Sequence, residues 1–189
     1  MQLLNKQPLT TADSILPGEG IRQDAILIGL GTFLITLCAQ IEIPLQPVPI
    51  TGQTFGVLFI AALLGANRGA ITVISYLSLG AVGLPVFAGG ATGLTAFAGP
   101  TAGYLIGFIA AAYLVGYLSE FGLDRKFMTA TLSMTLGTLV IFLFGSIGLV
   151  RFVGWDQVFQ LGVYPFLPGA IIKITLAASL LPQGRRFFQ

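Results

Sequence analysis

The chain alternates between long apolar stretches and shorter polar ones, and the alternation repeats six times after residue 23. None of the apolar stretches shows the one-in-two pattern of a half-buried strand. Their lengths, about 16 to 22 residues, suit helices that cross a hydrocarbon core about 30 Å thick. The pattern therefore predicts six membrane-spanning helices, at 24–42, 51–66, 69–84, 101–119, 127–149 and 165–182.

Composition points to the same class of protein. Hydrophobic residues make up 55% of the chain and charged residues only 8%, whereas a soluble domain carries about 25% charged residues. A transmembrane β-barrel is excluded because its strands read as alternating segments of about ten residues. We expect an all-α integral membrane protein with a polar N-terminal tail (1–23), a six-helix membrane domain (24–182) and a short C-terminal tail (183–189).

The positive charges lie in one alternating set of connections. Between them, the two tails and the second and fourth connections hold seven of the nine lysines and arginines, namely Lys6, Arg22, Arg68, Arg125, Lys126, Arg185 and Arg186. The other connections hold only Arg151. Cytoplasmic loops carry the excess of Lys and Arg in membrane proteins, so both termini are expected in the cytoplasm.

The three connections predicted to face outward are long, apolar and rich in glycine and proline. They span 41–54, 83–103 and 151–169 and hold seven of the ten prolines. Long connections of this kind commonly form functional lids. We expect them to fold over the helices as an extracellular lid above a binding site.

Lys173 is the strongest single functional signal, because it lies inside the apolar phrase "PFLPGAIIKITLAASLLP" (165–182). An ionisable group in a membrane span commonly faces the bundle interior and marks a functional site. The alternative is that its amine reaches the headgroup region while its stem lies along lipid. No Asp or Glu occupies the core of a span, so an anionic ligand would supply the countercharge.

Other candidate residues each allow two interpretations. Tyr104 is either an interfacial tyrosine or a phenol at the mouth of a cavity. Gln53 either offers its amide to a ligand or takes part in hydrogen bonding at the start of a helix. The phrase "FAGG", with Phe87, Gly89 and Gly90, either lets the backbone approach a ligand closely or forms a plain turn.

Small residues recur at helical spacing along the first span, at Ala25, Gly29, Thr32 and Thr36. Such a face permits close helix packing, either within the protein or against a partner.

Several classes of function are excluded. The chain has no histidine and one cysteine, and the spans carry no clustered acids. Neither a His-based triad nor a Cys/His metal site can form, so we expect no enzyme, no metal and no cofactor. A net charge of +2, spread thinly, gives no nucleic-acid footprint.

Three phrases in register resemble the BioY family, the biotin-binding S component of energy-coupling factor (ECF) vitamin transporters. They are "PVPITGQT" (47–54), "GLPVFAGG" followed by "GPTAGY" (83–104), and "PFLPGAIIK" (165–173), and the resemblance covers about residues 24–182. It implies capture of biotin from outside, followed by uptake across the cytoplasmic membrane. The implied partners are the transmembrane coupling protein EcfT, which docks on the first helix, and two ATPases that carry out the ATP hydrolysis.

Carried over position by position, the family's lysine, tyrosine and glutamine fall on Lys173, Tyr104 and Gln53. Ala170 departs from the family pattern, since most relatives carry Asp there, one helical turn before the lysine. That departure keeps two alternatives open beside an ECF-dependent biotin transporter. One is an S component for a different small vitamin or carboxylate, and the other is a solitary biotin transporter.

Overall fold

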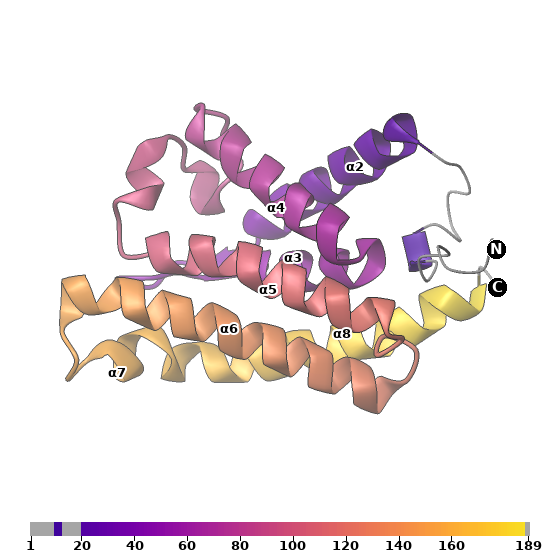
Figure 1. The fold of residues 1–189 in the computed structure, drawn as a ribbon. Coiled ribbons are helices and arrows are strands. Elements are labelled where there is room, and N and C mark those ends of the chain that lie inside the picture. Colours follow the sequence, from indigo (N-terminus) through magenta and orange to yellow (C-terminus); the bar gives the residue numbers. More distant parts are fainter. Residues whose placement is uncertain (1–9, 13–19, 188–189) are drawn as a thin grey trace, which may run out of the picture.

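The computed structural model describes residues 10–12 and 20–187, with side chains as far as Gln183, and this part of the chain is a helical bundle (Figure 1). Six helices of twelve residues or more build it: α2 (Ile21–Ala39), α3 (Gln53–Leu64), α4 (Ala66–Ala81), α5 (Ala102–Glu120), α6 (Phe127–Val153) and α8 (Leu167–Phe187). They correspond one to one with the six predicted spans. The last helix continues through Pro182, where the prediction ended it.

Helix length divides the six into two groups. In the described part of the chain, four helical segments are long and apolar enough to cross a membrane. They are α2, α5, α6 and the segment Val158–Gln183, which includes most of α8. At 1.5 Å per residue, α3 and α4 extend only about 18 and 24 Å. Helix α3 follows the first long connection and α4 precedes the second. These connections extend the bundle beyond the ends of the two short helices.

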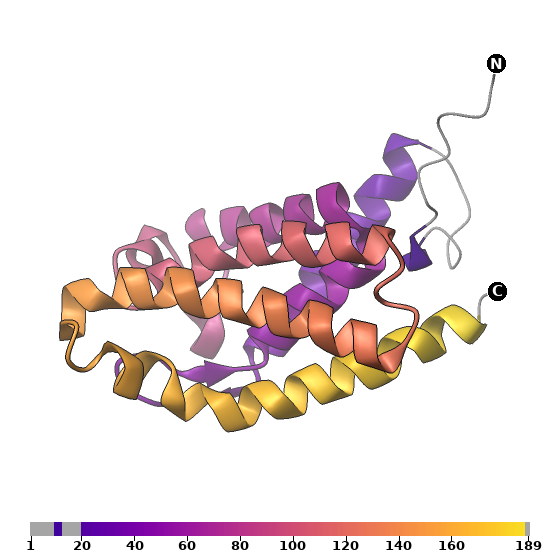
Figure 2. The same cartoon turned by 60° about the horizontal axis from the view of Figure 1, so that its bottom comes forward.

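The connections fall at two opposite ends of the bundle (Figures 1 and 2). The start of α2, the α3–α4 turn, the α5–α6 turn and the end of α8 share one end, which we call the basic end. The opposite end holds the three long connections, with elements β1 (Glu42–Ile43), β2 (Ile50–Thr51), η1 (Ala88–Gly90), η2 (Leu94–Phe97), α7 (Val158–Gly162) and η3 (Tyr164–Phe166). The connections that share an end of the bundle are the same ones that the distribution of lysines and arginines groups together.

The first long connection contains a short antiparallel ladder that sequence analysis did not anticipate. Strand β1 pairs with β2, so that Glu42 lies opposite Thr51 and Ile43 opposite Ile50. Two residues per strand are too few to produce a readable alternation. The ladder fixes the position of Thr51 directly before α3.

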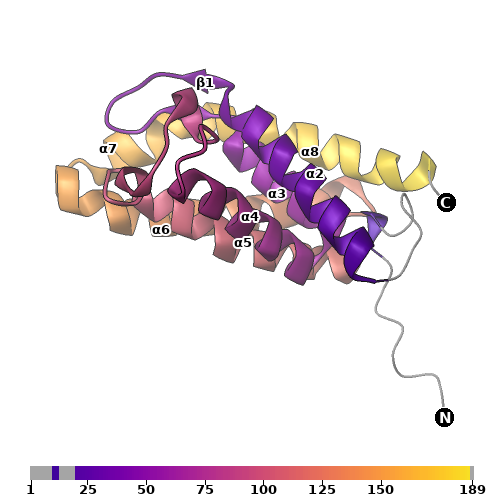
Figure 3. The same cartoon turned by 90° about the horizontal axis from the view of Figure 1, so that it is seen from above.

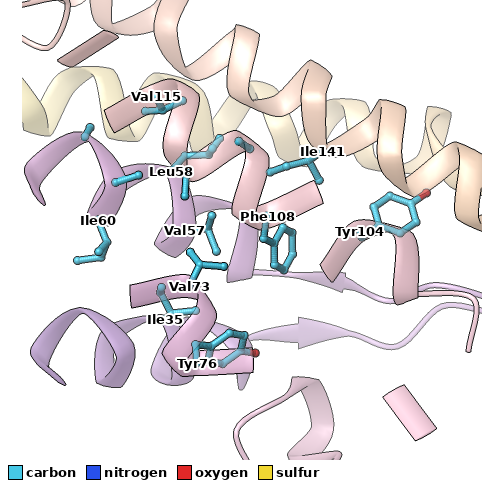
Figure 4. Close-up of a cluster of buried hydrophobic side chains, with 14 of the residues drawn as sticks. Ile35, Val57, Leu58, Ile60, Val73, Tyr76, Tyr104, Phe108, Val115 and Ile141 are labelled. Atoms are coloured by element: carbon cyan, nitrogen blue, oxygen red, sulfur yellow. The ribbon is translucent and has the colours of Figure 1, made fainter. Parts of the chain in front are cut away.

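The core fills the space between the helices with apolar side chains (Figure 4). Ile35, Val57 and Val73 from α2, α3 and α4 are fully buried. Many equally apolar side chains on α6 and α8, including Leu143 and Ile172, face outward instead. An apolar exterior over long helices is the property expected of a protein surrounded by lipid.

Glycines allow α5 to approach its neighbours closely. A Cβ placed on Gly148 of α6 would lie 2.7 Å from the Cα of Gly103 in α5. Such backbone contact through small residues is typical of helix packing in membranes, where close approach rather than the hydrophobic effect holds helices together.

Part of the predicted N-terminal tail packs against the basic end. The side chains of Thr11 and Asp124 are both almost fully buried, and the Thr11 hydroxyl donates a hydrogen bond to Asp124 Oδ2 at 3.0 Å. Among the cations used to predict orientation, Lys6 and the side chains of Arg185 and Arg186 lie outside the described part of the chain.

Candidate functional site

Lys173 reaches from α8 to the start of α3. Its ammonium donates hydrogen bonds to the backbone carbonyl of Thr51 at 2.6 Å and to the hydroxyl of Thr54 at 2.9 Å. The side chain is half-buried and points into the bundle. This geometry favours the functional interpretation over an amine extended toward headgroups.

No carboxylate pairs with Lys173 among the described residues; the ion pair found there joins Arg68 to Asp24 at the basic end. Removing an ammonium from water costs several kcal/mol even after relaxation. Two hydrogen bonds to a charged group return about 1.5–3 kcal/mol each. The site therefore holds a positive charge that a bound anion would stabilise.

Lys173 lines a cavity beneath the long connections, which we call the outer cavity. Its empty volume is about 870 Å³, including space at its open mouth. The wall is mostly apolar, with Lys173, Gln53 and a few hydroxyls as its polar groups. The lining residues are Val48, Pro49, Thr51, Gln53, Thr54, Phe87, Ala88, Ala91, Ala96, Thr101, Tyr104, Leu105, Phe108, Ile141, Phe142, Phe166 and Lys173.

Gln53 belongs to a buried polar chain at the wall of this cavity. Its Oε1 accepts a hydrogen bond from the Thr51 hydroxyl at 2.8 Å, and its Nε2 donates to the Tyr76 hydroxyl at 2.6 Å. Tyr76 in turn donates to the carbonyl of Val86 at 3.1 Å. Gln53 thus takes part in hydrogen bonding at the start of α3 and also lines the cavity, where an amide contact to a ligand stays a prediction.

The second long connection contributes Phe87 to the cavity. The Phe87 ring packs edge-on against Tyr76 and Phe97, at centroid distances of 5.5 and 5.8 Å. Its carbonyl accepts a hydrogen bond from Gln40 Nε2 at 3.1 Å, which ties the connection to the end of α2.

Gly89 and Gly90 do not line the cavity, although Ala88 and Ala91 on either side do. Both glycines have positive φ, 62° and 72°, so they form the turn that presents their neighbours. This geometry supports the plain-turn interpretation at these two positions.

Tyr104 lines the cavity with its ring, which lies beside Phe166 at a centroid distance of 6.1 Å. Its hydroxyl donates to the carbonyl of Gly162 in α7 at 2.7 Å and is therefore not free to donate to a ligand. Figure 4 shows Tyr104 and Tyr76 at separate places in the core, with both hydroxyls at its edge. Each tyrosine thus fastens one long connection to the helices.

Ala170 lines a smaller neighbouring cavity of about 400 Å³ rather than the outer cavity. The two cavities share Thr54, Phe142, Phe166 and Lys173 in their walls. Lys173 therefore stands between the two cavities, and the side chain at position 170 faces the smaller one.

The small residues of α2 do not form one free face. Ala25 and Gly29 are exposed, and a Cβ on Gly29 would meet nothing within 4 Å. Thr32 is buried, with its hydroxyl donating to the Thr72 carbonyl at 3.3 Å, and Thr36 is partly buried. Helix α2 runs obliquely across its neighbours (Figure 3), and along it Thr32 packs against Thr72 of α4 while Ala25 and Gly29 stay exposed.

Sequence reasoning missed two groups of residues that shape the site. Thr54 and Tyr76 were not identified, although a hydroxyl in the first turn of an apolar span and a tyrosine in the middle of one are both readable signals. The aromatic wall formed by Phe108, Phe142 and Phe166 carried no signal, since phenylalanine is ordinary in a membrane span.

Comparison with known proteins gives a consistent result. The sequence pattern of the BioY family matches residues 9–189. The biotin transporter BioY of Rhizobium etli is 41% identical over 165 residues, covering 82% of this chain and 85% of the relative. The biotin transporter BioY of Thermotoga maritima is 39% identical over 157 residues, covering 82% of this chain and 91% of the relative.

A solved structure has the same fold. The crystal structure of the S-component for biotin from an ECF-type ABC transporter matches with a TM-score of 0.75 and 26% identity, over 89% of this chain and 95% of that one. Since the family pattern spans nearly the whole sequence and the helices superpose over most of it, this multi-pass membrane protein belongs to the BioY family.

Proposed function

We propose that this protein binds biotin in the outer cavity and serves its uptake across the cytoplasmic membrane, as the substrate-specific component of an ECF-type transporter. The observation that carries the proposal is Lys173, a cation without a carboxylate partner among the described residues, in the wall of the outer cavity. Membership of the BioY family supports biotin as the ligand.

The carboxylate of biotin provides the missing countercharge. An ammonium has three N–H donors, and Lys173 uses two of them on Thr51 and Thr54. The third remains for an acceptor in the cavity. Hydrogen bonds between ionised groups are about twice as strong as neutral ones, so this contact fixes one end of the ligand.

The fused rings of biotin need both apolar walls and amide partners. Phe87, Phe108 and Phe166 supply aromatic surface. Gln53 retains one N–H and one lone pair beyond its bonds to Tyr76 and Thr51, which suit the ureido group. An empty volume of about 870 Å³ falls within the roughly 300–1,000 Å³ of small-molecule sites.

The proposed topology puts both termini in the cytoplasm and the outer cavity toward the outside. Arg22, Arg68, Arg125 and Lys126 belong to the basic end, opposite the cavity, as the positive-inside rule requires. The three long connections then act as an extracellular lid, held by Gln40, Tyr76 and Tyr104.

Uptake in this scheme requires EcfT and two ATPases. The exposed part of α2 around Ala25 and Gly29 suits close approach of another helix. Thr32 and Thr36 contribute to packing within the protein instead and are left out of the proposed docking face.

A second candidate ligand is another small vitamin or carboxylate. Ala170 favours it, because the resemblance to the family implies an Asp at this position, whereas no carboxylate among the described residues lines the smaller cavity. Mass spectrometry of ligand retained by the purified protein separates the candidates: biotin supports the proposal, and a different carboxylate replaces it.

Biotin uptake by cells that express this chain, with and without the ECF module, tests the transport role. We expect uptake only when the module is present. Equal uptake in both strains would favour a solitary transporter, and no uptake in either, with folded protein in the membrane, would refute transport.

A further inference from the structure

An open groove lies between the α5–α6 turn and α8, two elements that meet at the basic end, opposite the long connections (Figure 2). It encloses about 700 Å³ of empty volume, including open solvent. Residues Arg125, Lys126 and Phe127 form one wall, and Ala178, Ser179 and Gln183 form the other.

The two cations of this groove are available to a ligand. Both Arg125 and Lys126 are exposed, and neither side chain has a hydrogen-bond or ion-pair partner within the described ranges. Arg125 folds back over Gly122, where a Cβ would lie 2.9 Å from its Nε. Gly122 has a φ of +84°, so the turn both needs glycine and leaves room for the guanidinium.

The neighbouring acids are engaged elsewhere. Asp124 is 2% exposed and accepts a hydrogen bond from Thr11. Glu120 accepts one from the backbone N–H of Ala66 at 2.8 Å. The groove therefore presents a net positive charge.

Apolar surface leads away from the cations along both helices. On α6, Phe127 and Met128 are exposed, and on α8 Leu176 and Leu180 are exposed. A small soluble anion would use only the cations, whereas a ligand with both an anionic head and long apolar chains would use the whole surface.

We propose that this groove binds the phosphate headgroup of an anionic phospholipid, with the acyl chains lying against α6 and α8. Arg125 presents a planar fork that matches phosphate oxygens, and Lys126 adds a second charge. Basic pockets between transmembrane helices are suited to such headgroups. The lipid would join the α5–α6 turn to the end of α8 without touching the outer cavity.

Native mass spectrometry of the full chain in detergent, titrated with phosphatidylglycerol or phosphatidylcholine of identical acyl chains, tests this site. We expect phosphatidylglycerol to bind tighter, and the double variant Arg125→Gln/Lys126→Gln to lose about tenfold or more of that affinity. The charge-preserving variant Arg125→Lys/Lys126→Arg should keep most of it. Arg22→Gln removes a cation from the same end outside the groove and should leave binding unchanged.

Three outcomes would overturn the proposal. The first is equal affinity for phosphatidylcholine and phosphatidylglycerol, and the second is a loss of binding in Arg22→Gln as large as in the double variant. Displacement of the lipid by inorganic phosphate at matching concentration would assign the groove to a free anion. An unchanged unfolding temperature for each variant shows that the comparison concerns folded protein.

Discussion

The ammonium of Lys173 donates a hydrogen bond at 2.9 Å to the hydroxyl of Thr54, a residue 119 positions earlier in the chain. This bond and the one to the Thr51 carbonyl hold the lysine of α8 against the start of α3, at the wall of the outer cavity. Thr54 therefore helps to fix the position of the positive charge in the wall of the outer cavity.

Replacing Thr54 with valine keeps the shape of the side chain and removes one acceptor from Lys173. We expect biotin affinity to fall about two- to tenfold, the equivalent of about 0.5–1.5 kcal/mol for one hydrogen bond. Isothermal titration of purified protein measures it. Thr135→Val is the matched control, because that hydroxyl bonds the Thr131 carbonyl of its own helix away from the cavity. Equal effects of the two variants would contradict the positioning role.

Tyr104→Phe should loosen the third long connection. The change leaves the Gly162 carbonyl without its partner, which costs about 1–3 kcal/mol when the group is buried. We expect faster biotin dissociation and faster amide hydrogen exchange across α7, with a smaller effect on association. Tyr164→Phe is the control, because Tyr164 is 60% exposed. Unchanged dissociation would show that the bond does not hold the lid.

Ala170→Asp places a carboxylate one turn before Lys173, facing the smaller cavity. Opposite charges at this spacing attract on a helix, so the new carboxylate would take up part of the lysine's charge. We expect the preference for biotin over its uncharged methyl ester to fall about threefold, or about 0.7 kcal/mol. Competition binding with both ligands measures the ratio. An unchanged preference would show that the carboxylate of biotin does not lie against Lys173.

Gly29→Leu should separate docking from folding. A Cβ at Gly29 meets nothing within 4 Å, so we expect unchanged stability and biotin binding but weaker copurification with the ECF module. Thr32→Leu should lower stability and biotin binding but leave copurification of the folded protein unchanged, since Thr32 is buried against α4 and bonds the Thr72 carbonyl. Full copurification of the Gly29→Leu variant would exclude this surface from the interface.

The six helices could be predicted from the sequence because each is a long apolar run, and the charged turns separated the two ends of the bundle. Lys173 also stood out, since a lysine is costly in a membrane span. Its partners could not be predicted, because Thr51 and Thr54 lie 122 and 119 positions away and only the packing of α8 on α3 joins them.

Two other features depended on packing that a single sequence does not encode. The stripe from Ala25 to Thr36 looked continuous, yet the oblique crossing of α2 buries Thr32 and leaves Gly29 open. For Gly89 and Gly90 the sequence allowed either a close approach to a ligand or a plain turn, and their positive φ angles form a turn that brings Ala88 and Ala91 to the cavity.

The central claim is that biotin supplies the countercharge of Lys173, and equilibrium binding of biotin to Lys173→Met tests it most directly. Methionine keeps much of the apolar stem and removes the ammonium. We predict that purified wild-type protein binds biotin and that the variant, folded to the same unfolding temperature, binds it more than about tenfold weaker, a loss above about 1.4 kcal/mol. Equal affinity in the two proteins would contradict the account.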